Sequence, residues 1–465
     1  MKLYNTLSKE IEEFDPNEEN KVKIYTCGPT VYHYAHIGNL RTYIFEDILE
    51  KGFRYLGYDV TRAMNITDVG HLTSDGDTGE DKMAKGAKRE GKTVYEIADF
   101  YTKAFLQDME SLNIKVPEII EKASENIDVY IKMIEKMMED GYAYLSNGNV
   151  YFDISKAKDY YRLSGKNPDD LKIGVRDTVD LDKAKRNPAD FVLWFTLSKF
   201  ENQVMKWDSP WGVGYPGWHI ECSGISYKIF GDHLDIHCGG VDNIFPHHSN
   251  EIAQSEAFLG HKWCNYWCHG AHLNDESGKM SKSKGEFLTV SLLKEKGYSP
   301  LDYRFFCLNS HYRNSLVFTY DSLNGARNAY QKLKTKVSSL TDDGEIEEDK
   351  FKNYQEQFKN ALESDLNTSL MITVLYGVLK DNELNDRTKK ALVEDFDQVL
   401  SLDLLKEEEQ KIDSYLEQFV LEKIEERKEA KKDKNFQKAD EIREELLSKG
   451  IRLIDTREGT TYELI

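Results

Sequence analysis

Cys27 begins a short segment whose residue types suit both a metal and a nucleotide. An apolar, strand-like stretch precedes the cysteine, a Gly-Pro turn follows it, and His33 and His36 then lead into Gly38 and Asn39. A strand, a glycine-containing turn and a helix start in this order predict a nucleotide-phosphate site, because free backbone N–H groups at a helix N-terminus attract anions. The sequence therefore places a metal-capable thiol directly beside a predicted phosphate site.

A second pattern of metal-capable residues lies in the sequence FPHHSNE, at residues 245–251. Proline favours a helix start, so His247 and Glu251 would lie four residues apart on one helix face. That pair alone is typical of a surface ion pair. With Cys27 and Cys222 added, a metal site becomes the better interpretation. Two thiolates, an imidazole and a carboxylate make a tetrahedral zinc set if the fold brings them together.

A competing cluster of Cys264, Cys268, His269 and His272 has the spacing of a compact metal-binding finger. Its apolar neighbours, among them Trp267, favour a buried strand in which the cysteines are small core residues. We therefore place the metal at the first set rather than at this cluster.

Residues 278–285, GKMSKSKG, carry three lysines between serines and glycines. Such a loop suits a polyphosphate, since each lysine ammonium can act as a point charge on phosphate oxygens. Composition alone favours a solvated basic turn. The presence of the His36 segment in the same chain favours the phosphate-binding interpretation instead.

The elements that must position these residues form a predicted β–α–β unit. Apolar residues recur at helical spacing over residues 40–53, and residues 60–69 follow as a second strand. This opening predicts an α/β fold with a Rossmann-like, doubly wound parallel sheet, in which ligands bind at the carboxyl ends of the strands. Further strands are expected at residues 190–197 and 233–237.

Helices and turns complete the prediction. We expect helices at residues 93–112 and 117–140, a surface loop region at 71–92, and a hairpin turn at Asn147-Gly148. The expected domains are a catalytic domain at 1–298 with an insertion at about 113–189, an α-helical region at 299–405, and a small mixed C-terminal module at 406–465. An acidic run at 341–350 is the predicted linker between helices of the second domain.

The overall composition indicates an ordinary globular protein of the cytoplasm. Among 465 residues, 62 Lys and Arg face 82 Asp and Glu, and the net charge of −20 argues against indiscriminate binding of nucleic acid. The six cysteines are scattered, which fits reduced thiols or metal ligands better than a disulfide framework. No stretch has the length of a membrane span, so no membrane partner is expected.

The chain resembles a known family of enzymes in several separate motifs. HIGN at residues 36–39 and KMSKS at residues 279–283 are similar to the two signatures of class I aminoacyl-tRNA synthetases. Together with CGPTVY, PGWHIEC and FPHHSNE, they resemble the cysteinyl-tRNA synthetases, and the similarity extends nearly from end to end. Asn39 stands where the class I signature ends in histidine, and its amide can still donate a hydrogen bond to a phosphate or ribose oxygen.

The resemblance implies an ATP-dependent cysteine–tRNA ligase with one zinc ion per chain. The expected zinc ligands are Cys27, Cys222, His247 and Glu251. Zinc would bind the substrate thiolate far better than a hydroxyl or methyl group, whereas an apolar pocket separates cysteine poorly from serine and alanine. The expected neighbours of the substrate cysteine are Thr67, Trp218 and Asp242.

The resemblance also implies where ATP, bound with Mg²⁺, would lie. The expected ATP contacts are His33, His36, Gly38, Asn39, Gly239, Gly240 and Lys282, and the expected catalytic residues are His36, Asn39, Lys279 and Lys282. The lysines would stabilise charge on the pyrophosphate as the cysteine carboxylate attacks the α-phosphorus. That is catalysis by positioning and electrostatics rather than through a covalent enzyme intermediate.

tRNA(Cys) is the expected macromolecular partner of a monomeric enzyme. The helical region would bind the tRNA stem, and the C-terminal module would bind the anticodon. The lysine-rich stretch at residues 428–438 offers local positive charge, although interleaved glutamates make a solvated helix face equally compatible with it.

Two other functions fit parts of the same pattern. A related ligase that transfers activated cysteine to an amino-sugar would keep the metal set and Lys282, but it would have no use for the long segment after Ser299. A zinc-stabilised RNA-binding protein without catalysis would not need an intact KMSKS. We therefore favour the synthetase over both.

Overall fold

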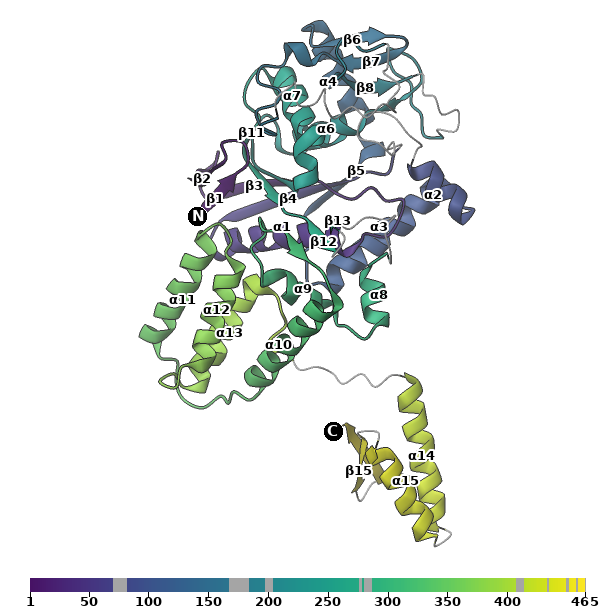
Figure 1. Cartoon of the computed structure of the whole chain (residues 1–465), viewed down its shortest axis with the longest axis vertical. Helices are drawn as coiled ribbons and strands as arrows, with labels where there is room; N and C mark the ends of the chain where they lie inside the picture. Colours follow the sequence, from purple (N-terminus) through teal and green to yellow (C-terminus); the bar gives the residue numbers. More distant parts are fainter. Residues whose placement is uncertain are drawn as a thin grey trace. The chain divides into compact units, whose positions relative to one another are not determined.

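The computed structural model describes residues 1–69, 82–166, 184–196, 204–275, 278–279, 287–406, 414–432, 435–448, 451–456 and 459–464. The chain forms two compact units, Met1–Leu405 and Lys406–Ile465 (Figure 1). Within the described ranges, no helix combines the length and the apolar character needed to cross a membrane.

A five-stranded parallel sheet is the centre of the first unit. Its strands are β3 (Lys21–Thr26), β4 (Asp59–Ile66), β5 (Ile119–Lys122), β10 (Leu234–Gly240) and β11 (Cys264–Gly270). The strand order is β11-β10-β3-β4-β5, and every pairing is parallel. The chain therefore winds outward in both directions from β3 and β10, which confirms the predicted doubly wound α/β fold.

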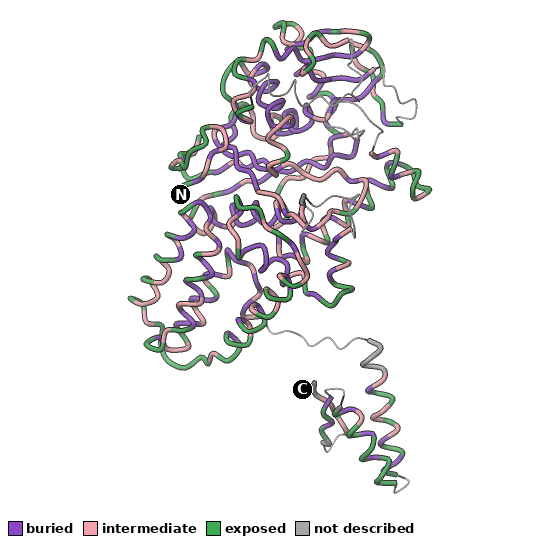
Figure 2. The backbone as a smooth tube through the Cα atoms, viewed as in Figure 1, coloured by how far each residue is buried: buried purple, intermediate pink, exposed green. Residues whose placement is uncertain are grey.

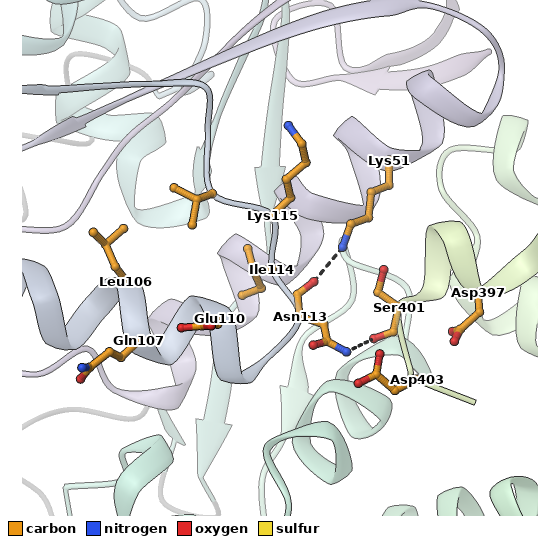
Figure 3. Close-up of a pocket in the computed structure, with 11 residues that line it drawn as sticks. Lys51, Leu106, Gln107, Glu110, Asn113, Ile114, Lys115, Asp397, Ser401 and Asp403 are labelled. Carbon is orange, nitrogen blue, oxygen red and sulfur yellow. Dashed lines mark hydrogen bonds between the residues drawn. The ribbon is translucent and has the colours of Figure 1, made fainter. Parts of the chain in front are cut away.

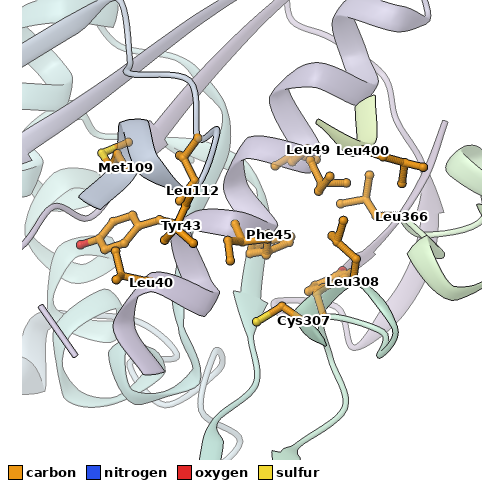
Figure 4. Packing of buried hydrophobic residues seen from close by; sticks show 14 of the residues in the cluster. Leu40, Tyr43, Phe45, Leu49, Met109, Leu112, Cys307, Leu308, Leu366 and Leu400 are labelled. Carbon is orange, nitrogen blue, oxygen red and sulfur yellow. The ribbon is translucent and has the colours of Figure 1, made fainter. Parts of the chain in front are cut away.

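The helix α1 (Ile37–Tyr55) joins β3 to β4 and carries much of the core. Its residues Leu40, Tyr43 and Leu49 are buried, and because Leu40 and Leu49 lie on opposite sides of the helix, α1 is enclosed by the core on more than one side. Figure 4 shows these side chains among others from α3 (Val94–Ser111) and α9 (Pro300–Leu308). Figure 2 shows that the buried backbone is concentrated in the sheet and in the helix faces turned toward it.

A smaller antiparallel sheet has the order β6-β7-β8-β9. Its strands are β6 (Ala143–Ser146), β7 (Asn149–Phe152), β8 (Phe191–Phe195) and β9 (Tyr215–Pro216). Asn147 and Gly148 both have positive φ, at 45° and 84°, as a two-residue hairpin turn requires, and the predicted hairpin is confirmed. The helices α4 (Ile127–Glu139), α6 (Trp218–Phe230) and α7 (Ser249–Leu259) pack against one another between the two sheets (Figure 1).

Two predicted elements were wrong in part. The expected helix at 117–140 begins only at Ile127, because Ile119 and Ile120 instead pair with Ala63 and Met64 as strand β5. A pair of β-branched residues favours a strand when a neighbouring strand is available. Within the expected loop at 71–92, residues 82–90 form the helix α2 (Lys82–Glu90), and residues 70–81 lie outside the described ranges.

The region after the sheet is helical, as predicted. Its helices are α8 (Val290–Glu295), α9, α10 (Tyr320–Ser338), α11 (Glu348–Glu363), α12 (Thr368–Lys380) and α13 (Asp386–Leu400). The second unit contains α14 (Ser414–Lys432), α15 (Phe436–Ser448), β15 (Ile451–Thr456) and β16 (Gly459–Leu464). The short strands β1 (Lys2–Asn5) and β2 (Glu10–Glu13) pair near the N-terminus, and β12 (Leu273–Asp275), β13 (Gly278–Lys279) and β14 (Leu316–Val317) form a small separate sheet.

A buried ion pair joins the sheet region to the helical region. Arg304 on α9 bonds Asp47 on α1 at 2.7 Å, and its other nitrogens donate to the carbonyls of Leu400 and Leu112 at 2.8 and 3.0 Å. Both charged side chains are fully buried. Burial raises the pKa of Asp47, but the charges of Arg304 and Lys51 outweigh that effect and lower it.

A cavity of about 610 Å³ lies beside this joint, between α1, α3 and the turn after α13 (Figure 3). Lys51 donates to the carbonyl of Asn113 at 2.7 Å, and the Asn113 amide donates to the carbonyl of Ser401 at 3.1 Å. Lys51 also pairs with Asp47, and Lys115 pairs with Glu50. The cationic groups of this cavity are thus satisfied by the protein itself, and no predicted site residue lines it.

Arg304→Met is expected to lower the free energy of unfolding of the first unit by ~3–5 kcal/mol, because it removes one partner of a buried ion pair. Urea denaturation followed by circular dichroism measures this change. The matched control is Arg387→Met, which breaks an exposed pair with Asp342 and is expected to leave the midpoint nearly unchanged. Equal midpoints for the two variants would show that the Arg304 pair does not join the two regions.

Candidate active site

A second cavity of about 610 Å³ lies where the order of the central sheet reverses. It opens at the carboxyl ends of β3 and β10, which is the place where doubly wound folds bind ligands. The predicted site residues that line it are Cys27, His33, His36, Gly38, Asn39, Trp218, Gly239, Gly240 and Asp242. The fold therefore gathers residues that are far apart in the sequence around one cavity.

The N-terminus of α1 forms one wall of this cavity. His36 is the N-cap residue, and its Nδ1 accepts a hydrogen bond from the backbone N–H of Asn39 at 3.3 Å. Gly38 leaves room for that imidazole, since a Cβ at this position would come within 2.9 Å of the ring. The positive end of a helix of 19 residues therefore faces the cavity and favours an anion there.

The four predicted metal ligands meet at the edge of the same cavity. The ligand atoms of Cys27, Cys222, His247 and Glu251 all lie within 4.8 Å of one another. The two sulfurs are 3.9 Å apart, and His247 Nε2 is 2.9 Å from Glu251 Oε1. Cys27 follows β3, Cys222 lies on α6, and His247 and Glu251 belong to the turn Ile244–His248 and to α7. The fold therefore brings the four residues together, which their spacing in the sequence could not show.

Two buried histidines support this group from behind. His219 Nδ1 lies 2.9 Å from His247 Nδ1, and His237 Nε2 lies 2.9 Å from Glu251 Oε2. Such partners fix the orientation of metal ligands. Sequence reasoning missed both residues, although His219 stands in the PGWHIEC motif three positions before Cys222 and could have been noticed there. His237 is a strand residue with no motif of its own to mark it.

A second group of potential ligands overlaps with the first. Cys27, His237, His248 and Glu251 also have ligand atoms within 4.8 Å of one another, and His248 Nε2 is 3.2 Å from Cys27 Sγ. Because the two groups share Cys27 and Glu251, they are alternatives around one position. The predicted group offers two sulfur donors through Cys222, and zinc favours that set.

The charges within the cluster favour a bound cation. Burial raises the pKa of Glu251, but the charges of His237 and His247 outweigh it and lower that pKa to about 2. Burial lowers the pKa of His247, but the negative charges of Glu251 and Cys222 raise it to about 10. In the metal-free cluster a proton on His247 thus balances the carboxylate, and a divalent cation can take the place of that positive charge.

The other predicted residues lie at different depths. Trp218 stacks on the His247 ring with centroids 4.2 Å apart, so it forms a wall beside the metal group. Asp242 lines the cavity 3.3 Å from His272. The Thr67 hydroxyl is buried and donates to Glu221 at 3.0 Å, so it lies behind the cavity wall.

Of the two lysines of the KMSKS motif, the structure describes only the backbone of Lys279. The backbone of Lys279 pairs with Asn274 between β13 and β12, and Lys282 lies outside the described residues. Cys264 and Cys268, from the competing cluster, are buried in β11 as core residues, as the sequence predicted.

Comparisons with known proteins agree with this geometry. The family model described as "tRNA synthetases class I (C) catalytic domain" matches residues 13–328. A solved methionyl-tRNA synthetase of Mycobacterium tuberculosis, bound by methionyl-adenylate, covers 82% of the chain and 90% of its own length at 14% identity, with a TM-score of 0.53. That likeness shows a shared fold. The fold and the family model together define a class I aminoacyl-tRNA synthetase.

Curated relatives narrow the class to one family. A cysteine–tRNA ligase of Treponema denticola is 47% identical, and the match covers 100% of this chain and 99% of the relative. One of Borreliella burgdorferi is 46% identical over 99% of this chain and 98% of the relative. The chain therefore belongs to the cysteine–tRNA ligase family.

Cys222→Ser is expected to lower the zinc affinity of the purified protein by more than ~100-fold, because it removes one of two sulfur ligands. Competition with a chromophoric zinc indicator measures that affinity. Cys264→Ser is the control, since Cys264 is equally buried but lies on β11 outside the cluster. An unchanged affinity in the Cys222 variant would favour the alternative group that contains His248.

Proposed function

We propose that this protein activates L-cysteine with ATP to form cysteinyl-adenylate and then transfers cysteine to the 3′ end of tRNA(Cys). One observation carries the proposal, namely that a Cys₂-His-Glu group and the N-terminus of α1 face one cavity. The cluster suits a substrate thiol, and the helix N-terminus suits a substrate phosphate. The two substrates of the first half-reaction would therefore lie side by side.

Cys27, Cys222, His247 and Glu251 would hold one zinc ion at the amino-acid end of the cavity. The donor set fits zinc, and the positive charge that the cluster holds on His247 supports a resident cation. Zinc, when bound, supplies a site that prefers a thiolate over a hydroxyl or methyl group. Trp218, stacked on His247, would close the pocket around the short side chain and exclude water, and Asp242 would neighbour the substrate amino group.

His36 and Asn39 would position ATP, bound with Mg²⁺, at the helix N-terminus. Gly239 and Gly240 end β10 at the cavity and let the nucleotide approach the backbone, with His33 and Gly38 beside them. Lys279 and Lys282 would then neutralise charge on the departing pyrophosphate. These groups act by orientation and electrostatic stabilisation, because the cysteine carboxylate is itself the nucleophile.

Arg41 links the nucleotide end of the cavity to the KMSKS segment. Its guanidinium is buried and donates to the carbonyls of Ala271 and His272 at 2.9 and 2.7 Å, just before β12. On the other side of the motif, the backbone N–H of Ile37 donates to the carbonyl of Leu288 at 2.9 Å. The first turns of α1 thus hold both ends of residues 273–287, and we assign Arg41 a positioning role for this segment.

The remainder of the chain would recognise the tRNA. We propose that residues 299–405 bind the tRNA stem and residues 406–465 the anticodon, with 1–298 as the catalytic domain and its insertion at about 113–189. The enzyme would act as a monomer in the cytoplasm. The coverage of whole-length cysteine–tRNA ligases supports a role for every part of the chain.

Cysteine-dependent exchange of labelled pyrophosphate into ATP tests the first half-reaction, and charging of total tRNA tests the second. We expect exchange with cysteine and none with serine, followed by charging of one tRNA. Absence of exchange would refute the proposal. Exchange without charging would favour the ligase that transfers cysteine to an amino-sugar.

Arg41→Lys is expected to raise the KM for ATP about tenfold in pyrophosphate exchange, because one ammonium cannot bridge the carbonyls that hold the KMSKS segment. The KM for cysteine is expected to stay within about twofold, since the metal cluster makes no contact with this arginine. A general structural defect would instead lower kcat and leave the ratio of the two KM values unchanged, and that pattern would remove Arg41 from a positioning role.

A further inference from the structure

A third group of potential metal ligands lies far from the candidate active site. Asp232 and His233 follow α6 and precede β10, and His261 follows α7 and precedes β11. Because β10 and β11 are adjacent and parallel, the segments that enter them meet at the amino-terminal edge of the sheet. The candidate active site is at the other end of β10, about 20 Å away along a strand of seven residues. The sequence motifs gave no role to these three residues.

The ligand atoms of this surface triad, Asp232, His233 and His261, all lie within 4.8 Å of one another. His233 Nδ1 is 3.0 Å from Asp232 Oδ1, and His261 Nε2 is 3.9 Å from Asp232 Oδ2. Ligands at about 2.1 Å from a tetrahedral zinc ion are separated by about 3.4 Å. Small rotations of exposed side chains therefore suffice to bring the three donors to one ion.

The tautomer of His261 leaves its Nε2 available to a metal ion. Its Nδ1 lies 2.9 Å from the carbonyl oxygen of Lys262, and a carbonyl can only accept, so Nδ1 carries the proton. In the neutral ring, Nε2 then presents a lone pair toward the Asp232 carboxylate, where it can accept a proton or bind a metal cation. A histidine whose other N–H bonds a carbonyl has the usual form of a metal ligand.

The helix ends around the triad also favour positive charge. α6 ends at Phe230 before Gly231, and α7 ends at Leu259 before Gly260, and both glycines have positive φ. The negative ends of two helices therefore point toward the segments that carry the triad. Two lysines of α4 line the neighbouring cavity, but one is paired with Asp140 at 2.6 Å.

We propose that Asp232, His233 and His261 form a second metal site, which binds a borderline divalent cation such as zinc or copper. Two imidazoles and a carboxylate are donors that suit these ions, and water would fill the remaining position. A bound ion would tie the C-terminal ends of α6 and α7 together. These same helices carry Cys222 and Glu251, so the site would brace the frame of the candidate active site from its far side.

The test uses the full chain with Cys27→Ser, which removes a ligand common to both possible active-site groups, so that the surface triad is measured without either group intact. After removal of metal by a chelator, the Cys27→Ser protein is titrated with zinc, and we expect it to bind about one equivalent. Adding His261→Ala, or separately His233→Ala, is expected to abolish that binding. Asp140→Asn in the same background is the control, since this exposed carboxylate lies on the neighbouring helix end and outside the triad.

A spectroscopic measurement separates the triad from residual binding at the active site. Copper bound to the Cys27→Ser protein should show electron paramagnetic resonance hyperfine structure from two imidazole nitrogens, and His261→Ala should remove it. Zinc binding that survives both histidine changes would overturn the proposal, as would a Cys27→Ser protein that binds no metal. These two results concern the surface triad alone and do not test cysteine activation. In the otherwise native chain, His261→Ala is expected to leave cysteine activation unchanged.

Discussion

Glu251 is a fully buried carboxylate, and much of the candidate active site is built around the need to compensate its charge. An uncompensated carboxylate in the interior is costly, so the side chain requires cationic or hydrogen-bonding partners on both oxygens. His237 on β10 meets one oxygen and His247 meets the other. These contacts fix α7 against the central sheet. The metal group therefore has a structural role, since its residues compensate the buried charge of Glu251, as well as being a place for a ligand.

Much of the fold could be predicted from the sequence, because alternation of strand, turn and helix around Cys27 is a local pattern that indicates a doubly wound sheet. The metal group joins residues far apart in the chain, so its prediction depended on residue types and on the family resemblance, with the spacing of His247 and Glu251 as the only local signal. The strand β5 was missed since its identity depends on a neighbouring strand rather than on its own residues. His237 was missed for a similar reason, because it acquires a role only when β10 brings it beside α7.

The position of β3 beside β10 explains why the segment from Cys27 to His36 can serve both a metal and a nucleotide. β3 and β10 are neighbours at the point where the strand order reverses, so Cys27 emerges at the base of the cavity. The chain then needs only the short turn to His36 before α1 begins. The N–H of Cys27 donates to the carbonyl of Cys238 at 3.3 Å, which holds this cysteine to the end of β10. The metal-capable thiol is thereby held at the end of the sheet, one residue beyond β3.

Because Cys27 is fixed at the end of the sheet, the cavity can select its substrate by the length of the side chain. The thiol group that would reach the cluster and the carboxylate that would reach the nucleotide belong to one small molecule, and the two ends of the cavity are held apart by β3, β10 and α1. A side chain longer by one methylene would shift its carboxylate by about 1.5 Å from the attacking position. Since misplacement by about 1 Å can cost a hundredfold in rate, homocysteine would be rejected by stiffness of the scaffold, although its thiol is chemically equivalent.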